Sequence, residues 1–276
     1  MKTKGGGIQE KIGLIGVGNM GSAILSGLLE KGKAQPRQIY VHDILKEKAA
    51  QFAAEHKINE PVPFLAGLVR RVEVVLLAIK PQDLKEVGSG LKLYLTHKHT
   101  LISILAGTPI ARIKEVAGEK ASIVRAMPNL GAKVGRAITA LGGSSKKSLK
   151  IAEGIFSACG ETIILEDEPY FDLVTAVSGS GPAYFFLMME MLADFAETKG
   201  LSKKDAQTLA VQTAVGAGLL AESSSISPAE FRKMVTSKGG TTEAALRVLE
   251  ERKFGEIFHQ ALEAAFQRGR ELSRGN

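Results

Sequence analysis

The sequence of 276 residues predicts an α/β domain built on a mostly parallel sheet, followed by an all-α domain. Up to Glu166, short apolar segments alternate with amphipathic ones, which is typical of strands separated by helices. After Glu166 the alternation stops and helical patterns dominate. With 45% apolar residues, the chain can fill the cores of two ordinary domains. We therefore expect a flexible extension at residues 1–10, an α/β domain at 11–166 and a helical domain at 167–276.

The apolar pattern predicts the individual elements. Strands are expected at residues 11–15, 38–42, 73–79, 100–105, 122–125 and 137–141. Helices are expected between them at 20–32, 46–56, 82–95 and 148–158, and in the second domain at 202–222, 241–252 and 256–273. Ser202, with Asp205 three positions on, is a weak helix-start signal. The segment Ser227–Glu230 is a stronger one, because it combines a capping serine, a proline at the first helical position and a glutamate at the third.

Composition narrows the function classes. The single cysteine, Cys159, excludes an internal disulfide framework and fits a reducing compartment, where we expect a buried structural thiol. No apolar run reaches the roughly 20 residues of a membrane span, and residues 1–7 lack the apolar core of a secretory signal. The net charge of +7 is dispersed among acidic residues, which favours a small polyanionic ligand over nucleic acid. The histidines show no metal-ligand spacing. We expect a cytoplasmic protein without metal, nucleic-acid or membrane partners.

A glycine motif indicates a dinucleotide cofactor. Gly16-Val17-Gly18-Asn19-Met20-Gly21 directly follows the first strand and opens the first helix. In this context the first glycine allows a tight turn, the second lets a pyrophosphate approach the backbone, and the third lets helix and strand pack closely. The alternative is a glycine-rich turn without a ligand. We predict a Rossmann-type site for NADH or NADPH, with candidate residues Ile15, Gly16, Gly18, Asn19, Met20 and Gly21.

Three further segments belong to this predicted site. Asp43 ends the second strand, 22 positions after Gly21, where a carboxylate can accept from the adenosine ribose and would repel a 2′-phosphate. Nearby His42, Lys46 and Lys48 could supply the opposite charge, and Asp43 could instead cap the next helix, so the 2′-phosphate preference stays open. Two loops at strand ends, 78–81 and 106–109, would line the same crevice. Their candidate residues are Ala78, Lys80, Pro81 and Ala106, of which Lys80 could equally be a solvated lysine.

The helical part carries the most specific motifs. Asp172-Leu173-Val174-Thr175-Ala176-Val177-Ser178-Gly179-Ser180-Gly181-Pro182-Ala183-Tyr184 and Val235-Thr236-Ser237-Lys238-Gly239-Gly240-Thr241-Thr242 resemble two hallmark stretches of the pyrroline-5-carboxylate reductases. The glycine motif, Ala78–Pro81 and Met127-Pro128-Asn129 match family patterns in the same order. The resemblance implies reduction of 1-pyrroline-5-carboxylate to L-proline by NADPH or NADH, the last step of proline biosynthesis. It also implies a Rossmann domain and a helical dimerisation domain that interleaves with a second subunit, in dimers that assemble further in many members, commonly into decamers.

The resemblance also implies a substrate site. Thr242 would contact the ring nitrogen as the catalytic residue, while Thr241, Gly240 and Ser237 would surround the substrate carboxylate. Glu168 matches a position near the substrate in relatives. The chemistry agrees, because a protonated cyclic imine is already electrophilic and needs mainly positioning and a hydroxyl or backbone donor. Plain helix capping is the alternative for Ser237 and Thr241.

The sequence departs from the family pattern at three places, which bear on cofactor preference and rate more than on the reaction. Lys238 stands where most relatives have proline, Leu130-Gly131 replaces threonine and proline, and Leu65 stands roughly where many relatives have asparagine. A proline would stiffen the loop, whereas lysine adds a positive charge near an anionic substrate.

Two alternative functions share the dinucleotide motif. A β-hydroxyacid dehydrogenase-like oxidoreductase would carry a catalytic lysine in the helix after a glycine-rich turn, but Gly181–Met188 contains none. A non-catalytic dinucleotide-binding regulatory paralogue is supported only by Lys238 and the altered segment after Asn129. The apolar cluster of Phe185, Phe186, Met188 and Met189 is expected to pack in the core and the subunit interface.

Overall fold

The computed structural model describes residues 7–275, which divide into two compact units. The first unit comprises the chain up to Gly179 together with the segment from Phe266 onward, and the second comprises Ser180–Ala265. The first unit therefore continues beyond the predicted boundary at residue 166 and is completed by the end of the last helix. Residues 1–6 of the expected flexible extension lie outside the described residues. Its described part is anchored, since the Ile8 amide donates to the Lys33 carbonyl at 2.7 Å.

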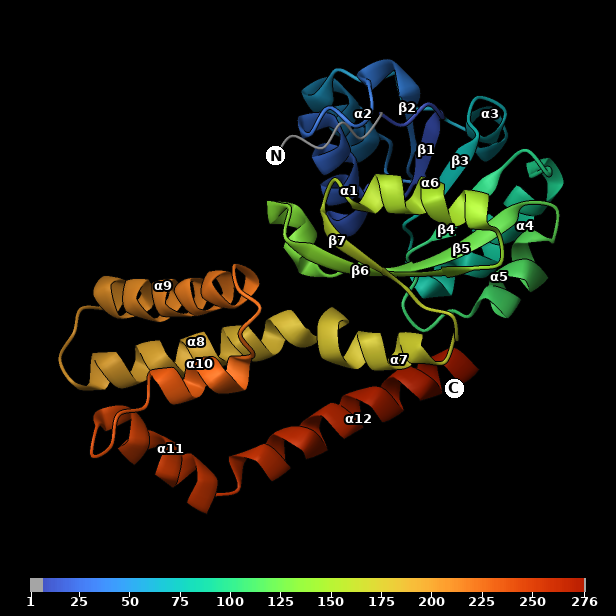
Figure 1. The fold of residues 1–276 in the computed structure, drawn as a ribbon. Coiled ribbons are helices and arrows are strands. Elements are labelled where there is room, and N and C mark those ends of the chain that lie inside the picture. Colours follow the sequence, from blue (N-terminus) through green and yellow to red (C-terminus); the bar gives the residue numbers. More distant parts are fainter. Residues whose placement is uncertain (1–6, 276) are drawn as a thin grey trace. The chain divides into compact units, whose positions relative to one another are not determined.

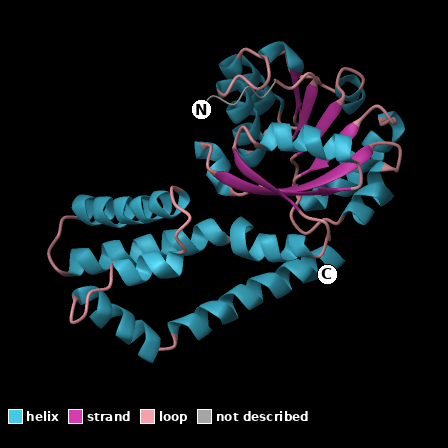
Figure 2. Cartoon of the chain, in the orientation of Figure 1, coloured by secondary structure: helices cyan, strands magenta, loops and turns pink. Residues whose placement is uncertain are grey.

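The first unit is built on a seven-stranded sheet of order β2-β1-β3-β4-β5-β6-β7 (Figures 1 and 2). The strands are β1 (Ile12–Ile15), β2 (Ile39–His42), β3 (Val74–Leu77), β4 (Thr100–Ser103), β5 (Ser122–Met127), β6 (Ala137–Gly143) and β7 (Gly160–Ile164). Neighbouring strands run parallel except for β5 and β6, which are antiparallel. This confirms the predicted mostly parallel sheet and the six expected strands, and adds β7. The sequence around β7 gives a weak signal because the strand is largely exposed.

Helices cover both faces of the sheet, because successive residues of each central strand point to opposite sides. In β3, Val74 and Leu76 join one apolar cluster, and Val75 and Leu77 join the other. The first cluster is covered by α1 (Asn19–Glu30), α2 (Lys46–His56) and α6 (Lys146–Phe156). The second is covered by α3 (Leu65–Val69), α4 (Leu84–Tyr94) and α5 (Ile110–Ala117). Double coverage explains why these strands are continuous apolar runs.

Several short elements connect and extend this core. The 3-10 turns are η1 (Pro36–Gln38), η2 (Pro81–Asp83) and η3 (Leu130–Val134). After β7, helix α7 (Tyr170–Val174) leads into a π-helical turn at Thr175–Gly179. The end of α12 (Phe254–Arg274) also belongs to the first unit, where Gly269 is buried and a Cβ added to it would lie 3.5 Å from Asp172. These elements extend the α/β unit beyond the Rossmann-type strands and helices that the sequence predicted.

The second unit contains only helices among its described residues (Figure 2). They are α8 (Gly181–Thr198), α9 (Lys203–Glu222), α10 (Pro228–Met234), α11 (Thr241–Glu251) and the start of α12. The predicted start signals are confirmed. The Ser202 hydroxyl accepts from the Asp205 amide, and Ser227 and Glu230 form a reciprocal capping box.

The buried core of this second unit is small. It consists of Ala193, Ala206 and Ala210, with Met189 and Ala196 packed against them. Large apolar side chains on α8 and α9 stay exposed, including Phe185 at 67% and Phe195 at 64%. An isolated helical unit does not normally expose so much apolar surface, so these side chains mark an interaction surface. Over the described residues, no helix combines the length and apolarity needed to cross a membrane.

Candidate functional site

The glycine motif forms a tight turn at the carboxyl end of β1. Gly16 has a φ of +93°, and a Cβ there would lie 2.6 Å from the Ala78 carbonyl oxygen. A Cβ at Gly21 would lie 2.5 Å from the Gly16 carbonyl oxygen. At Gly18, by contrast, the Cβ position has no described atom within 4 Å apart from the adjoining backbone. The first and third glycines are thus required by packing, whereas the second leaves backbone open to a ligand.

Helix α1 begins directly after this turn. Gly18 is its N-cap residue, no side chain caps it, and its first turn contains no acidic residue. Ser22 is the first residue whose amide bonds back to Gly18, so the amides of Asn19, Met20 and Gly21 precede the intrahelical ladder. Because the N-terminus of a helix carries partial positive charge, this end suits a pyrophosphate.

Asp43 is tied to the glycine turn. Its Oδ2 accepts from the Val17 amide at 2.7 Å and its Oδ1 accepts from the Leu45 amide at 2.9 Å. Leu45, not Asp43, is the N-cap residue of α2. The carboxylate therefore braces the two loops that follow β1 and β2, and each oxygen keeps a further lone pair for a ligand hydroxyl.

The other predicted cofactor residues follow β3 and β4. The sheet order reverses between β1 and β3, and ligands of open parallel sheets bind at such switch points, at the carboxyl ends of the strands. Ile15 ends β1, and Ala78 closes the turn by bonding its amide to the Ile15 carbonyl and contacting Gly16. Lys80 and Pro81 are exposed at the start of η2. Ala106, half-buried after β4, opens the loop before α5.

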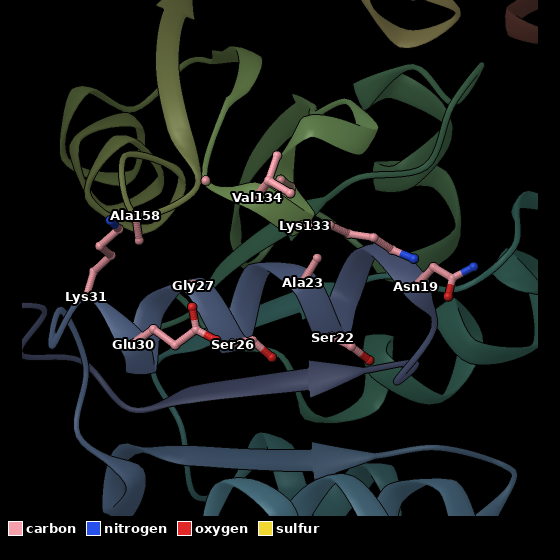
Figure 3. Close-up of a pocket in the computed structure, with 12 residues that line it drawn as sticks. Asn19, Ser22, Ala23, Ser26, Gly27, Glu30, Lys31, Lys133, Val134 and Ala158 are labelled. Carbon is pink, nitrogen blue, oxygen red and sulfur yellow. The ribbon is translucent and has the colours of Figure 1, made fainter. Parts of the chain in front are cut away.

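A pocket of about 510 Å³ lies along α1 (Figure 3). It is lined by α1 from Asn19 to Lys31 and by residues 132–135 and 158. In Figure 3 the Lys133 side chain extends toward Asn19. Asn19 is the only predicted cofactor residue among those lining it, so this pocket is separate from the crevice at the strand ends.

The second hallmark stretch forms a loop that enters α11. Gly239 has a φ of +74°, and its amide donates to the Glu243 carboxylate at 2.7 Å. A Cβ at Gly240 would lie 2.5 Å from Ser237 Oγ. Gly240 is the N-cap residue of α11 and makes no side-chain cap, so neither Ser237 nor Thr241 caps this helix. Both glycines are needed for a turn that brings Ser237 close to the start of the helix.

Thr242 is half-buried in the first turn of α11, and Thr241 beside it is exposed. The intrahelical ladder begins when the Ala244 amide donates to the Gly240 carbonyl, so the amides of Thr241 and Thr242 precede it. Lys238 is exposed in the loop. All the predicted substrate residues except Glu168 thus belong to one turn of the second unit, and this turn offers hydroxyl groups and amide donors together.

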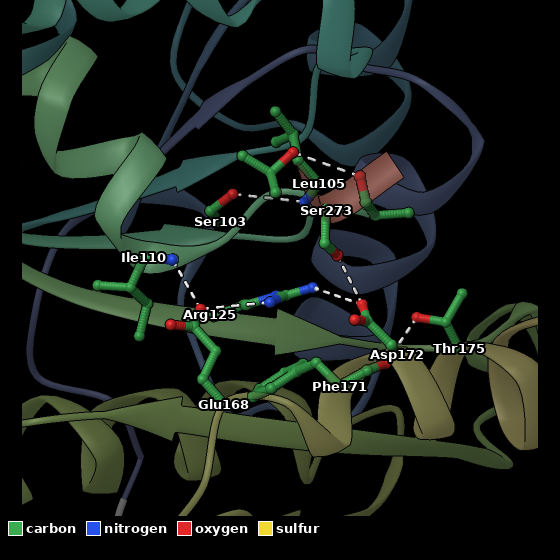
Figure 4. A network of polar contacts seen from close by, with 11 residues as sticks. Ser103, Leu105, Ile110, Arg125, Glu168, Phe171, Asp172, Thr175 and Ser273 are labelled. Carbon is green, nitrogen blue, oxygen red and sulfur yellow. Dashed lines mark hydrogen bonds and ion pairs between the residues drawn. The ribbon is translucent and has the colours of Figure 1, made fainter. Parts of the chain in front are cut away.

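Glu168 belongs to the first unit and makes specific bonds there (Figure 4). Its Oε1 accepts from the Ile110 amide at 2.6 Å and from Arg125 Nη1 at 3.2 Å. Arg125 is buried, and this burial lowers the pKa of its guanidinium, an effect that the hydrogen bond to Glu168 opposes. Sequence reasoning missed Arg125. The available signal was a charged residue inside the apolar strand before Met127-Pro128-Asn129.

The departures from the family pattern have local structural correlates. Asn129 caps η3 by accepting from the Gly131 amide at 3.2 Å. A Cβ at Gly131 would lie only 2.5 Å from the Arg136 carbonyl oxygen, so the observed loop conformation requires glycine at this position. Leu65 begins α3, and its Cδ1 would lie 3.1 Å from a Cβ at Gly90. Gly131 therefore fits its surroundings, and Leu65 lies beside Gly90.

Cys159 is fully buried, as predicted, and burial raises its pKa to about 11. Within residues 7–275, no three His, Cys, Asp or Glu side chains gather as a metal site.

Comparison with known proteins agrees with these motifs. The family model for pyrroline-5-carboxylate reductase dimerisation matches residues 168–272, and that for coenzyme F420-dependent NADP oxidoreductases matches residues 11–107. A pyrroline-5-carboxylate reductase of Pseudomonas aeruginosa is 40% identical over 266 residues, which is 95% of this chain and 97% of the relative.

Solved structures give the same result. A pyrroline-5-carboxylate reductase from Coxiella burnetii is 37% identical with a TM-score of 0.89, over 96% of this chain and 98% of its own. A Plasmodium falciparum pyrroline carboxylate reductase with NADP bound is 28% identical with a TM-score of 0.86, over 97% of this chain and all of its own. On full-length identity, fold and both hallmark turns, the chain belongs to the pyrroline-5-carboxylate reductase family.

Proposed function

We propose that this chain reduces 1-pyrroline-5-carboxylate to L-proline, with NADPH or NADH as the hydride donor. The observation that carries the proposal is that the chain contains both a ligand-accessible Gly18 turn, which belongs to the first unit, and a hydroxyl-bearing helix start at Thr241 and Thr242, which belongs to the second. Membership of the reductase family supplies the substrate class. The bound nicotinamide supplies the hydride.

The chain's own residues bind and orient the reactants. The pyrophosphate is held by the glycine turn (Gly16, Gly18 and Gly21) and by the amides of Asn19 and Met20. The cofactor crevice is lined by Ile15, Ala78, Lys80, Pro81 and Ala106. Asp43 braces the glycine turn and presents its remaining lone pairs to the adenosine ribose. Ser237, Gly240 and Thr241 receive the substrate carboxylate, which the N-terminal end of α11 stabilises.

Thr242 acts at the ring nitrogen. Reduction adds a hydride to the ring carbon of the C=N bond and leaves one proton on nitrogen, so the nitrogen must be protonated or hydrogen-bonded as electrons arrive. The Thr242 hydroxyl can hold that proton in place without itself being ionised. Glu168, in the first unit, contributes a carboxylate near the substrate. This carboxylate is held in place by the Ile110 amide and by Arg125.

We also propose that the active form is a homodimer with interleaved helical units, which could assemble further into a decamer. The exposed apolar side chains of α8 and α9 and the match to the dimerisation family support this. Native mass spectrometry should detect dimers or multiples of dimers, and a monomer at micromolar concentration would contradict it. We expect the protein in the cytoplasm, since its single thiol suits a reducing compartment.

One assay tests the function. The wild type should oxidise NADPH or NADH only when 1-pyrroline-5-carboxylate is present, and Thr242→Val should lower kcat/KM by about 10- to 100-fold through loss of one polar contact. Thr208→Val is the matched control, since the Thr208 hydroxyl bonds to the Lys204 carbonyl within α9. Turnover of β-hydroxyacids instead, or cofactor binding without turnover, would favour one of the alternative functions.

A further inference from the structure

Arg125 is a buried cation in the middle of β5. Its side chain is 3% exposed, and its guanidinium lies 4.5 Å from the centre of the Phe171 ring. Gly142 pairs with Arg125 across β5 and β6. A Cβ at Gly142 would lie 2.7 Å from Phe171, so the glycine makes room for the ring that covers Arg125. The Arg125 guanidinium therefore lies in a buried site shaped by Phe171 and Gly142.

Two carboxylates approach this guanidinium from the segment that holds α7. Glu168 Oε1 lies 3.2 Å from Arg125 Nη1, and Asp172 Oδ1 lies 3.9 Å from Nη2. Nη2 itself is buried without a hydrogen-bond partner among the described residues. A cation is costly to bury unless charges of opposite sign compensate it, so Arg125 and this acidic pair stabilise each other.

Each carboxylate also holds a second segment (Figure 4). Glu168 Oε1 accepts from the amide of Ile110, the first residue of α5. Asp172 Oδ1 accepts from the Ser273 hydroxyl at 2.6 Å, near the end of α12. One guanidinium thereby connects the start of α5 and the last turn of α12, which are far apart in sequence.

The two segments meet again at the loop Ala106–Pro109. This loop joins β4 to α5, so Ile110 is its exit. Gly107 has a φ of +63°, and a Cβ there would lie 2.7 Å from Leu272 Cβ, next to Ser273. The last turn of α12 therefore packs directly on the loop that Glu168 fixes from its other end.

We propose that Arg125 is a positioning residue that, through Glu168 and Asp172, holds the loop Ala106–Pro109 in its ligand-binding conformation. The inference rests on the proposed function, in which Ala106 lines the cofactor crevice. Glu168 fixes the exit of the loop at Ile110, and Asp172 fixes the α12 turn that covers Gly107. Without the guanidinium, the two carboxylates lose their shared counter-ion and both restraints on the loop weaken.

The loop can be monitored without any activity. Hydrogen exchange of the peptide spanning residues 104–113 reports on the Ile110 amide in the cofactor-free protein. Ser273→Ala and Glu168→Gln should each raise exchange in this peptide at least about threefold, because a weakened restraint increases the population of the open loop. Glu271→Gln is the matched control, since Glu271 lies in the same helical turn and pairs with Arg268 on the surface. Unchanged exchange in both variants would overturn the proposal.

Steady-state kinetics then separates positioning from mere stability. Ser273→Ala should raise the cofactor KM several-fold while kcat changes less than twofold, and Ser273→Thr, which keeps the hydroxyl, should restore it. A lower melting temperature with an unchanged cofactor KM would mean a structural role only, and would overturn the proposal. In Glu168→Gln, an unchanged cofactor KM would also overturn it, whatever happens to the substrate KM.

The Arg125 variants complete the series. Arg125→Lys retains the charge and should show a smaller rise in cofactor KM than Arg125→Met. If Arg125→Met does not fold, Ser273→Ala and Glu168→Gln still decide the question. Wild-type turnover with 1-pyrroline-5-carboxylate tests the proposed function independently, and its failure would leave the exchange result on the loop intact.

Discussion

The carboxylate of Asp43 accepts a hydrogen bond from the backbone amide of Val17 at 2.7 Å. This bond ties the end of β2 to the glycine turn after β1. The side chain that sequence reasoning assigned to the ribose is therefore also part of the frame of the turn. Its position is fixed before a ligand arrives, and its charge lies where an adenosine 2′-substituent is expected.

This geometry predicts the effect of Asp43→Asn on cofactor preference. The amide keeps one oxygen as an acceptor for a backbone amide but removes the negative charge, so a 2′-phosphate meets less repulsion. We expect the ratio of kcat/KM for NADPH over NADH to rise about tenfold, equivalent to about 1.4 kcal/mol. Glu47→Gln, which removes an exposed charge from the first turn of α2, should leave the ratio unchanged. An equal ratio in Asp43→Asn and wild type would show that the carboxylate does not sense the 2′-position.

Gly131 gives a stability prediction. Gly131→Ala places a Cβ 2.5 Å from the Arg136 carbonyl oxygen, so the backbone of η3 must shift. We expect a loss of about 1–3 kcal/mol in the free energy of unfolding, measured by urea denaturation. Gly154→Ala is the matched control, because its Cβ would meet only Ile8 Cγ1 at 3.9 Å within helix α6. That variant should be neutral or more stable, since alanine favours helix over glycine.

Cys159 gives a reactivity prediction. A buried thiol with a pKa of about 11 carries roughly one thiolate per thousand molecules at pH 8. The native protein should therefore react with a disulfide reagent only as fast as the surrounding helices open. In denaturing urea the same thiol is exposed, and it should react completely at the rate of a free thiol. Rapid stoichiometric labelling of the folded protein would contradict the buried position between α1 and α6.

Glu230 gives a pH prediction. The backbone and side-chain hydrogen bonds from Ser227 hold the pKa of the Glu230 carboxyl below its ordinary value of 4.5. Because the folded pKa is lowered, the stabilisation of the α10 capping box is fully present above that ordinary value. It is lost as pH falls through the lowered folded value. An NMR titration of the Ser227 amide should show its midpoint below 4.5, and Glu230→Gln should abolish that titration. A midpoint at or above 4.5 would contradict the bond.

Much of the first unit could be predicted because its strands are apolar runs with helices between them. The ranges expected for β1, β2, β3 and β4 contain the observed strands, and the glycine turn has the geometry that its spacing implies. Helix starts at Ser202 and Ser227 were also predicted, since capping depends on residues three positions apart. Local signals were therefore sufficient wherever the structure depends on local bonds.

Elements that depend on distant partners or have weak local patterns could not be predicted. Helix α3 has five residues, and β7 is mostly exposed, so neither has a clear period. The bonds around Arg125 escaped prediction for another reason: Arg125 and Glu168 are 43 positions apart, Ile110 and Glu168 are 58 apart, and Asp172 and Ser273 are 101 apart. A buried arginine in an apolar strand indicates that acidic partners must lie nearby in the fold, but the residues next to it in sequence do not show which ones they are.

The return of α12 to the first unit has a consequence for biosynthesis. The seven strands of the sheet leave the ribosome before Leu272 and Ser273 are synthesised. The contacts of the last turn of α12 with Gly107 and Asp172 therefore form only after the sheet is available. Chains that stall before residue 266 carry every strand but an unfinished surface. We expect such fragments to be cleaved by proteases more readily than chains that include the last turns of α12, because the surface over Gly107 and Asp172 is then covered.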